Sequence, residues 1–190
     1  MRIAVIGTGN IGGTLGQRWL AAGHEVVYGG RQAGGQGPGG TPVLAAGDAL
    51  AGADVVVLAV PGPAVADVLA PHGAALDGRV VIDATNNIGA AEVNGHAAVA
   101  ATAPGAHYAR AFNTLGWENF AEPPPGAVLF YAADVGARPA AEELITAVGL
   151  DPVLLGDASA VGVVDALLPL WFALVRQHGG NRRIALRVTQ

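Results

Sequence analysis

A short apolar run followed at once by three spaced glycines constrains this chain more than any other feature of its sequence. Residues 2–6 read Arg-Ile-Ala-Val-Ile, and Gly7, Gly9 and Gly12 follow with the spacing G-x-G-x-x-G. A segment with alanine and leucine comes next, and a second β-branched run begins near residue 26. This order predicts a strand, a tight turn, a helix and a second strand.

The glycine spacing in this setting indicates a dinucleotide site. Gly7 permits the sharp turn, Gly9 lets the backbone approach a pyrophosphate, and Gly12 allows the helix to pack closely on the strand. Free N–H groups at the start of the helix then face the phosphates. The alternative, in which the glycines serve only the turn, is disfavoured because a strand and a helix flank them.

The end of the second predicted strand distinguishes NADP from NAD. A carboxylate there would bind a ribose 2′-hydroxyl and repel a 2′-phosphate. This chain has Gly29, Gly30 and Arg31 instead, so a guanidinium is available to pair with a phosphate. NADP is therefore the predicted cofactor, the alternative being that Arg31 is a solvated loop residue.

Composition limits the other classes of function. The net charge of −5 gives no reason to expect nucleic acid or an anionic membrane surface as a partner. With 0 cysteines the chain has no disulfide framework and no cysteine-ligated metal, and no metal site is predicted. The first strand begins directly after Met1, so we expect no targeting peptide and a cytoplasmic location.

Apolar runs and helical segments alternate along the rest of the chain, which predicts a doubly wound, parallel α/β sheet of the Rossmann type. The predicted strands cover residues 54–60, 79–84, 108–112, 128–132 and 152–155, and the predicted helices cover residues 10–22, 64–74, 92–102 and 138–148.

Polar or backbone-rich segments follow three of these strands, where a sheet of this kind binds its ligands. Ala59, Val60 and Pro61 are predicted to lie along the nicotinamide half of the cofactor. Asn86 and Asn87 could orient a polar planar substrate, or they could simply form a turn.

The segment after the strand at residues 108–112 presents a further loop to the same crevice. It contains Asn113, Thr114, Leu115 and Trp117. We expect this loop to contribute contacts to the cofactor and to the substrate.

The C-terminal segment differs from what precedes it. Residues 160–175 are nearly all apolar and include Trp171, while Asp165 and Pro169 interrupt the run. These two residues argue against a membrane span. We expect a Rossmann domain over residues 1–157 and a helical segment over residues 158–190. That segment would cap the crevice, with Trp171 near the substrate, or pack on a second subunit.

The order and spacing of several motifs resemble the coenzyme F420-dependent NADP reductase family over almost the whole chain. The motifs that carry the resemblance are Ile6-Gly7-Thr8-Gly9-Asn10-Ile11-Gly12, Gly23-His24-Glu25-Val26-Val27, Gly30-Arg31, Ala59-Val60-Pro61, Ala111-Phe112-Asn113-Thr114-Leu115-Gly116-Trp117 and Leu167-Leu168-Pro169-Leu170.

The resemblance implies a small dimeric Rossmann oxidoreductase that moves a hydride between NADPH and the deazaflavin F420. By the same resemblance, Thr8, Gly9, Asn10 and Ile11 hold the pyrophosphate and Gly30 with Arg31 holds the 2′-phosphate. The deazaflavin and nicotinamide rings would lie against the set Pro61, Asn86, Asn113, Thr114 and Leu115.

No residue stands out as a general acid, so catalysis by positioning is expected, without a catalytic side chain. The chain has no lysine, which argues against β-hydroxyacid dehydrogenases, a class that uses a catalytic lysine. Two alternatives stay open. One is an NADPH reductase of a flavin, quinone, imine or small carbonyl, and the other is a non-catalytic NADP(H)-binding redox sensor.

Overall fold

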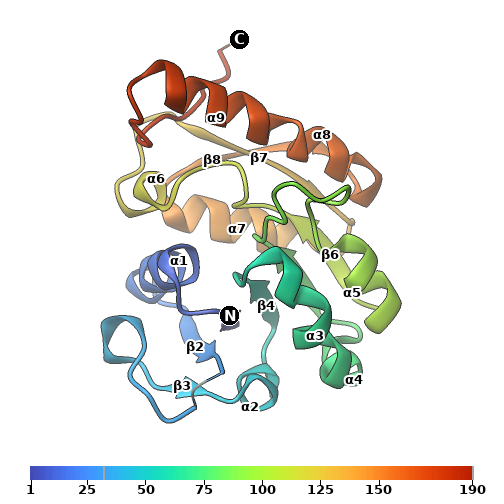
Figure 1. The fold of residues 1–190 in the computed structure, drawn as a ribbon. Coiled ribbons are helices and arrows are strands. Elements are labelled where there is room, and N and C mark those ends of the chain that lie inside the picture. The colour runs from blue at the N-terminus through green and yellow to red at the C-terminus, as the bar shows by residue number, and fades with distance from the viewer. Residues whose placement is uncertain (32, 190) are drawn as a thin grey trace.

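A computed structural model describes residues 1–31 and 33–189 and contains one sheet of eight strands (Figure 1). The strand order is β3-β2-β1-β4-β5-β6-β7-β8. The strands are β1 Arg2–Ile6, β2 Glu25–Gly29, β3 Val43–Leu44, β4 Val55–Leu58, β5 Val80–Asp83, β6 His107–Arg110, β7 Val128–Ala133 and β8 Asp151–Gly156. The strand order reverses between β1 and β4, and at such a point a doubly wound sheet opens a crevice.

Helices cover both faces of this sheet. They are α1 Asn10–Ala21, α2 Ala46–Leu50, α3 Val65–Leu69, α4 Gly73–Leu76, α5 His96–Thr102, α6 Trp117–Ala121, α7 Arg138–Val148, α8 Val161–Asp165 and α9 Leu167–Gln177, with 3-10 turns at Pro38–Gly40, Gly62–Ala64, Ala70–His72 and Ala158–Ala160. The predicted Rossmann architecture is confirmed.

The sheet separates two apolar cores because successive strand residues point to opposite faces. Ile3 and Val5 of β1 join the core that includes Trp19 of α1, whereas Ala4 and Ile6 join the core on the other face. All four residues of β4 are buried, as a continuous apolar run in a central parallel strand predicts.

The first predicted helix is confirmed at both ends. The α1 helix begins at Asn10, and Gly23 just beyond its end has a φ of 90°, a left-handed conformation that suits glycine. Trp19 anchors α1 to the second half of the chain, because its indole N–H donates to the Leu144 carbonyl at 3.0 Å.

Two predicted helices are shorter than expected. The helix predicted over residues 64–74 is divided into α3, a 3-10 turn and α4, because Pro71 lacks the N–H that a continuous helix needs. The helix predicted from residue 92 begins only at His96. Residues before it form a turn, in which the Gly95 N–H donates to the Asp83 carboxylate and the His96 N–H to Asn94 Oδ1.

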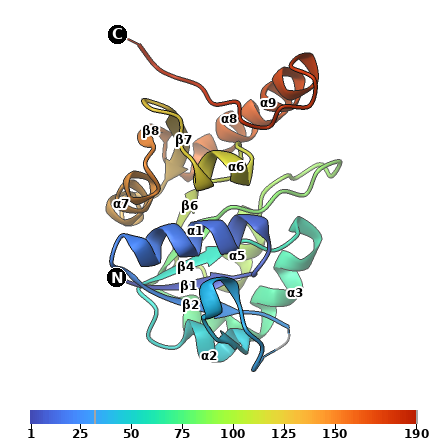
Figure 2. The same ribbon diagram turned by 90° about the vertical axis from the view of Figure 1, so that its left-hand side faces the viewer.

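The sheet departs from the predicted parallel arrangement at one strand pair. β6 and β7 run antiparallel, while β7 and β8 are again parallel. The connection from β6 to β7 contains only the short helix α6, so the chain returns along the same edge without a long crossover. Figure 2 shows β7 and β8 between α7 on one side and α8 with α9 on the other.

Only one face of the apolar C-terminal helices is buried. Val164, Leu168, Trp171 and Val175 pack inward, while the side of the helices that carries Leu170 is exposed. Residues 158–177 are long and apolar enough to cross a membrane, with a mean hydropathy of 1.9. In this fold, however, the segment packs on β7 and the pairing of its Asp165 with Arg110 ties it to the sheet. The domain division at residues 157 and 158 stays a prediction.

Candidate functional site

The glycine loop between β1 and α1 forms a cradle at the carboxyl end of the sheet. Gly7 has a φ of 117°, and a Cβ there would lie 2.4 Å from the Ala59 carbonyl oxygen. A Cβ on Gly12 would lie 2.1 Å from the Gly7 carbonyl oxygen. Both positions therefore require glycine for the fold itself.

Gly9 differs from its two neighbours. A Cβ on Gly9 would meet no atom within 4 Å among the described residues. No side chain in that part of the chain caps the first turn of α1, whose leading N–H groups are therefore available. Open space beside uncapped N–H groups at the start of a long helix fits a phosphate group.

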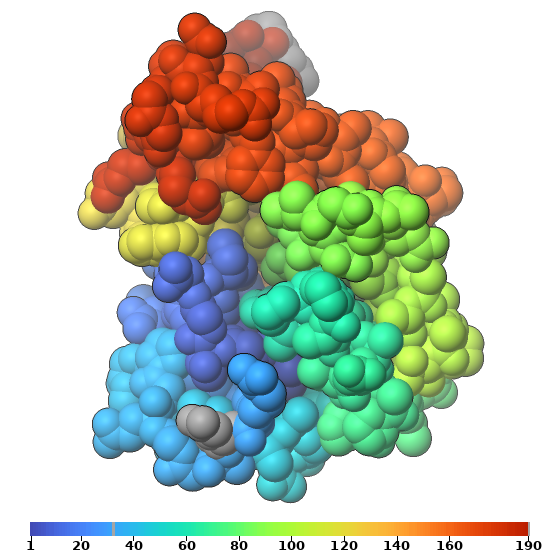
Figure 3. Space-filling model, in the orientation of Figure 1, coloured from blue at the N-terminus to red at the C-terminus, as the bar shows by residue number. Residues whose placement is uncertain are grey.

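An open cleft of about 500 Å³ runs from this cradle across the ends of β1, β2 and β4. Figure 3 shows it between α1 (blue) and α3 (teal). The residues that line it include the predicted set Gly7, Thr8, Gly9, Gly30, Arg31, Ala59, Val60 and Pro61. Asn10 and Ile11, predicted beside them, begin α1, and Ile11 packs against the core.

Arg31 is exposed and borders two adjoining hollows. One is the cleft, and the other is lined by Thr8, Gly30, Arg31, Gln36 and neighbouring backbone. A guanidinium at this junction provides the charge that a 2′-phosphate requires. The residues present thus fit NADP, with backbone N–H groups for the pyrophosphate and Arg31 for the additional phosphate.

The far wall of the cleft comes from residues that sequence reasoning missed. Asp67 and Val68 of α3 and Pro71 and His72 of the following turn face the glycine loop across it. The position of a helix directly after β4 was the available signal, since such helices border the crevice.

Asn86 and Asn87 have different surroundings. Asn86 Nδ2 donates to the Asn113 carbonyl at 2.8 Å, which joins the loops after β5 and β6. Asn87 instead closes a turn, because its N–H donates to Val93 and its carbonyl accepts from Ala90. The turn therefore occurs at Asn87, whereas substrate contact stays a prediction for both residues.

The loop after β6 begins with a strained residue. Phe112 has a φ of 62° although it is not glycine, and its fully buried ring packs edge-on against Trp19 and Phe120. This packing holds a conformation that costs about 1–3 kcal/mol.

Thr114, Leu115 and Trp171 come together away from the cleft. They line a small apolar cavity of about 10 Å³ under α9. Trp171 is 5% exposed, and its indole N–H donates to the Ile184 carbonyl at 2.9 Å. Trp117 begins α6 and is half-buried. The proposed ligand contacts of these four residues stay predictions.

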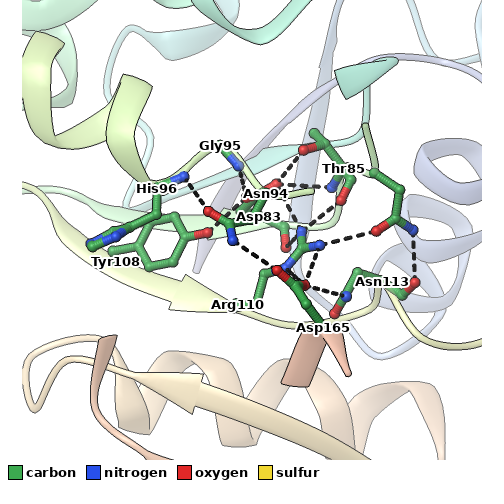
Figure 4. Close-up of polar contacts among 10 residues, drawn as sticks. Asp83, Thr85, Asn94, Gly95, His96, Tyr108, Arg110, Asn113 and Asp165 are labelled. Carbon is green, nitrogen blue, oxygen red and sulfur yellow. Dashed lines mark hydrogen bonds and ion pairs between the residues drawn. The ribbon is translucent and has the colours of Figure 1, made fainter. Parts of the chain in front are cut away.

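A buried polar network lies between β5, β6 and α8 (Figure 4). Arg110 pairs with the Asp83 carboxylate at 3.3 Å and with the Asp165 carboxylate at 2.7 Å, and the side chains of Arg110 and Asp83 are fully buried. The Asp83 carboxylate also accepts from Thr85 and from the Tyr108 hydroxyl at 2.7 Å. Two carboxylates thus surround one guanidinium.

Burial dominates the titration of the tyrosines. It raises the pKa of Tyr108 well above its ordinary value, and the charge of Asp83 raises it further while Arg110 opposes the shift. Burial alone raises the pKa of Tyr28, beneath α1, to about 12. Both hydroxyls therefore stay protonated at neutral pH and act as hydrogen-bond donors.

Arg110 and Asp165 were not among the predicted site residues. Each is a single charged residue in an otherwise apolar stretch, and such a residue is seldom buried unless it is paired. That signal was present in the sequence, but it does not identify the partner. Among residues 1–31 and 33–189, no cluster of three histidine or acidic residues could hold a metal ion.

Comparison with known proteins supports the class of the chain. Residues 2–87 match the family described as NADP oxidoreductase, coenzyme F420-dependent. This match agrees with the predicted resemblance over residues 2–87, which include the glycine loop, and supports the class of NADP-dependent oxidoreductase.

Solved structures support the fold. The chain is similar to a candidate F420-dependent NADP reductase from Arthrobacter sp. FB24, with a TM-score of 0.86 and 24% identity over 100% of both chains. A hypothetical protein from Sinorhizobium meliloti gives a TM-score of 0.74 and 27% identity over 100% of this chain and 96% of the other. An imine reductase from Aspergillus terreus, in complex with NADPH4 and a dibenzazepine, gives 0.71 and 23% over 93% of this chain and 63% of the other.

Proposed function

We propose that this protein transfers a hydride between NADPH and a deazaflavin of the coenzyme F420 type. The observation that carries the proposal is the match of residues 2–87 to an F420-dependent NADP oxidoreductase family. The cleft adds support, because the residues that line it fit NADP.

The chain's own residues would act mainly by binding and orienting. NADPH supplies the hydride, and the glycine loop with Arg31 would hold its phosphates. Ala59, Val60 and Pro61 border the cleft beyond the pyrophosphate cradle, where the nicotinamide half would lie. Their apolar surface would exclude water, and positioning would then provide most of the catalysis.

The acceptor would lie against the loops after β5 and β6. Asn86 is partly exposed there and Asn113 is buried, and the hydrogen bond from Asn86 Nδ2 to the Asn113 carbonyl keeps the two loops together. A planar ring with polar edges needs this combination of flat contact and a few fixed hydrogen-bonding groups. No proton relay is required of the protein for the hydride step itself.

The deciding assay follows NADPH absorbance with the purified protein and F420, FMN or no acceptor. Oxidation that depends on F420 and not on FMN is the expected result. Oxidation with FMN alone would reject the deazaflavin assignment, and NADPH binding without turnover on any acceptor would favour a redox sensor.

A second candidate is the reduction of an imine. The observation that favours it is the similarity to the Aspergillus imine reductase and to a reductive aminase from the same organism, whose solved complex contains NADPH. The chain spans about 62–63% of the length of those proteins, so their acceptor sites need not be reproduced here. A cyclic imine added to the same assay tests this alternative.

We further propose a cytoplasmic homodimer that joins through α8 and α9. Val163 is 55% exposed and Leu170 is 45% exposed, although the segment is strongly apolar. A second copy of the chain would cover this face. Sedimentation equilibrium should give twice the mass of the chain, and a monomer at all concentrations would contradict the proposal.

A further inference from the structure

Four residues form a closed ring of hydrogen bonds, in which Asn113 takes part through both its backbone carbonyl and its side-chain amide, and the ring joins α8 to the two loops predicted to meet the acceptor (Figure 4). Arg110 Nη2 donates to Asn86 Oδ1 at 3.0 Å, and Asn86 Nδ2 donates to the Asn113 carbonyl at 2.8 Å. Asn113 Nδ2 donates to Asp165 Oδ1 at 3.2 Å, and the same oxygen accepts from Arg110 Nε at 2.8 Å. Each of the two amides is therefore held through the Arg110 and Asp165 pair.

Residue 165 must be an acceptor at both of its oxygens. Oδ1 accepts from Arg110 and from Asn113, and Oδ2 accepts from Asn94 Nδ2 at 2.7 Å. All of these neighbours are donors, and a carboxylate is the short side chain that only accepts. An asparagine here would direct its own NH₂ at a donor on one side or the other.

The orientation of Asn113 is imposed by this arrangement. Its Nδ2 faces the carboxylate, and its Oδ1 is left buried with no hydrogen-bond partner among the described residues. A buried acceptor without a partner costs about 1–3 kcal/mol, so the amide does not adopt this orientation for its own hydrogen bonding. The charge of Asp165 fixes it.

We propose that Asp165 is a positioning residue, which holds the side-chain amide of Asn113 directly and that of Asn86 through Arg110, in the orientation that ligand binding requires. Asn113 Oδ1 is then left without a partner among the described residues, and an N–H donor of the ligand, such as a carboxamide or a ring N–H, would satisfy it on binding. This inference rests on the proposed reductase function for its catalytic consequence, although its first readout needs no acceptor.

The test compares Asp165→Asn with two controls in protein whose asparagine side-chain amides are isotope-labelled for NMR. Asp151→Asn makes the same change at an exposed carboxylate at the start of β8. Asn94→Ala cuts the Oδ2 contact and leaves the ring intact. We expect the amide signals of Asn86 and Asn113 to move in Asp165→Asn and in neither control. NADP⁺ should shift these signals in the wild type and not in Asp165→Asn.

Kinetics provide the second readout. In Asp165→Asn we expect the Kd for NADP⁺ to change little, while kcat with F420 falls on the order of tenfold to a hundredfold, as misplacement of a reacting ring implies. Circular dichroism checks that Asp165→Asn folds. If Asp165→Asn does not fold, Asp165→Glu takes its place, because glutamate keeps the charge and moves the carboxylate.

Unmoved amide signals in Asp165→Asn would overturn the proposal, and so would an equal response in Asn94→Ala. An unchanged kcat with displaced amides would also overturn it. If the wild type does not turn over F420, the proposed function fails, and the response of the amide signals to NADP⁺ still decides whether Asp165 positions them.

Discussion

Replacing Gly9 with valine should abolish cofactor binding and leave the fold intact. Gly9 has a φ of −72° and a ψ of −171°, an extended conformation that valine adopts readily. Its missing Cβ faces open space, with no atom within 4 Å in the described part of the chain. The free energy of unfolding should therefore change by no more than about 0.5 kcal/mol.

The loss of affinity follows from the hydrogen bonds that the valine would block. A hydrogen bond to a charged group contributes about 1.5–3 kcal/mol, so the loss of two from the first turn of α1 weakens NADPH binding by at least about 3 kcal/mol, roughly a hundredfold. Isothermal titration calorimetry measures this change, and thermal unfolding of the apoprotein checks the fold.

Two further variants make the comparison selective. Gly162→Val, at another glycine with open space around it, should alter neither property. Gly12→Ala should instead destabilise the apoprotein by about 1–3 kcal/mol, because its Cβ would lie 2.1 Å from a backbone oxygen. Unchanged NADPH affinity in Gly9→Val would remove the glycine loop from the binding site.

Two other predictions concern specificity and pH. Arg31→Ala should weaken NADP binding by about 1.5–3 kcal/mol and leave NAD binding nearly unchanged, as measured by calorimetry. Arg176→Ala, at another exposed arginine, is the control. Equal losses for both cofactors would refute the 2′-phosphate assignment. The folded state raises the pKa of Tyr28 from 10.0 to about 12, so the stability that its neutral hydroxyl contributes is complete below pH 10.0 and is lost as the pH rises toward about 12. Tyr28→Phe should therefore make the free energy of unfolding, measured with denaturant, less dependent on pH in that range. It should cost little stability near neutral pH, because the hydroxyl's bond to the Gly13 carbonyl is long, at 3.4 Å. An unchanged dependence of the unfolding free energy on pH between 10 and about 12 would contradict this.

The fold was predictable where local chemistry and the global arrangement agree. Gly7, Gly12 and Gly23 each meet a steric demand of the backbone, and the apolar run of β4 indicates a strand buried on both faces. The direction of β7 was not predictable in the same way. A strand's own residues specify which face is buried, but its direction depends on the length and path of the connection before it.

In the candidate site, too, the part that depends on local backbone geometry was predictable and the part that depends on distant contacts was not. The phosphate cradle depends on local backbone geometry, and Gly7, Gly9 and Arg31 meet in one cleft as their spacing predicts. The proposed acceptor side depends instead on contacts between residues far apart in the chain, and its sequence signals are ordinary. An asparagine after a strand forms a turn at Asn87 and enters a polar ring at Asn86.

The buried pair of Arg110 and Asp165 explains why the acceptor side resists prediction from sequence. Replacing such a pair with apolar residues is often neutral or even stabilising, so stability alone gives little reason to bury it. Here the pair fixes the positions of two side chains, because Arg110 holds Asn86 while Asp165 holds Asn113. The polar atoms of this site are therefore set by α8, more than fifty positions from Asn113 along the chain, and only the folded structure brings them together.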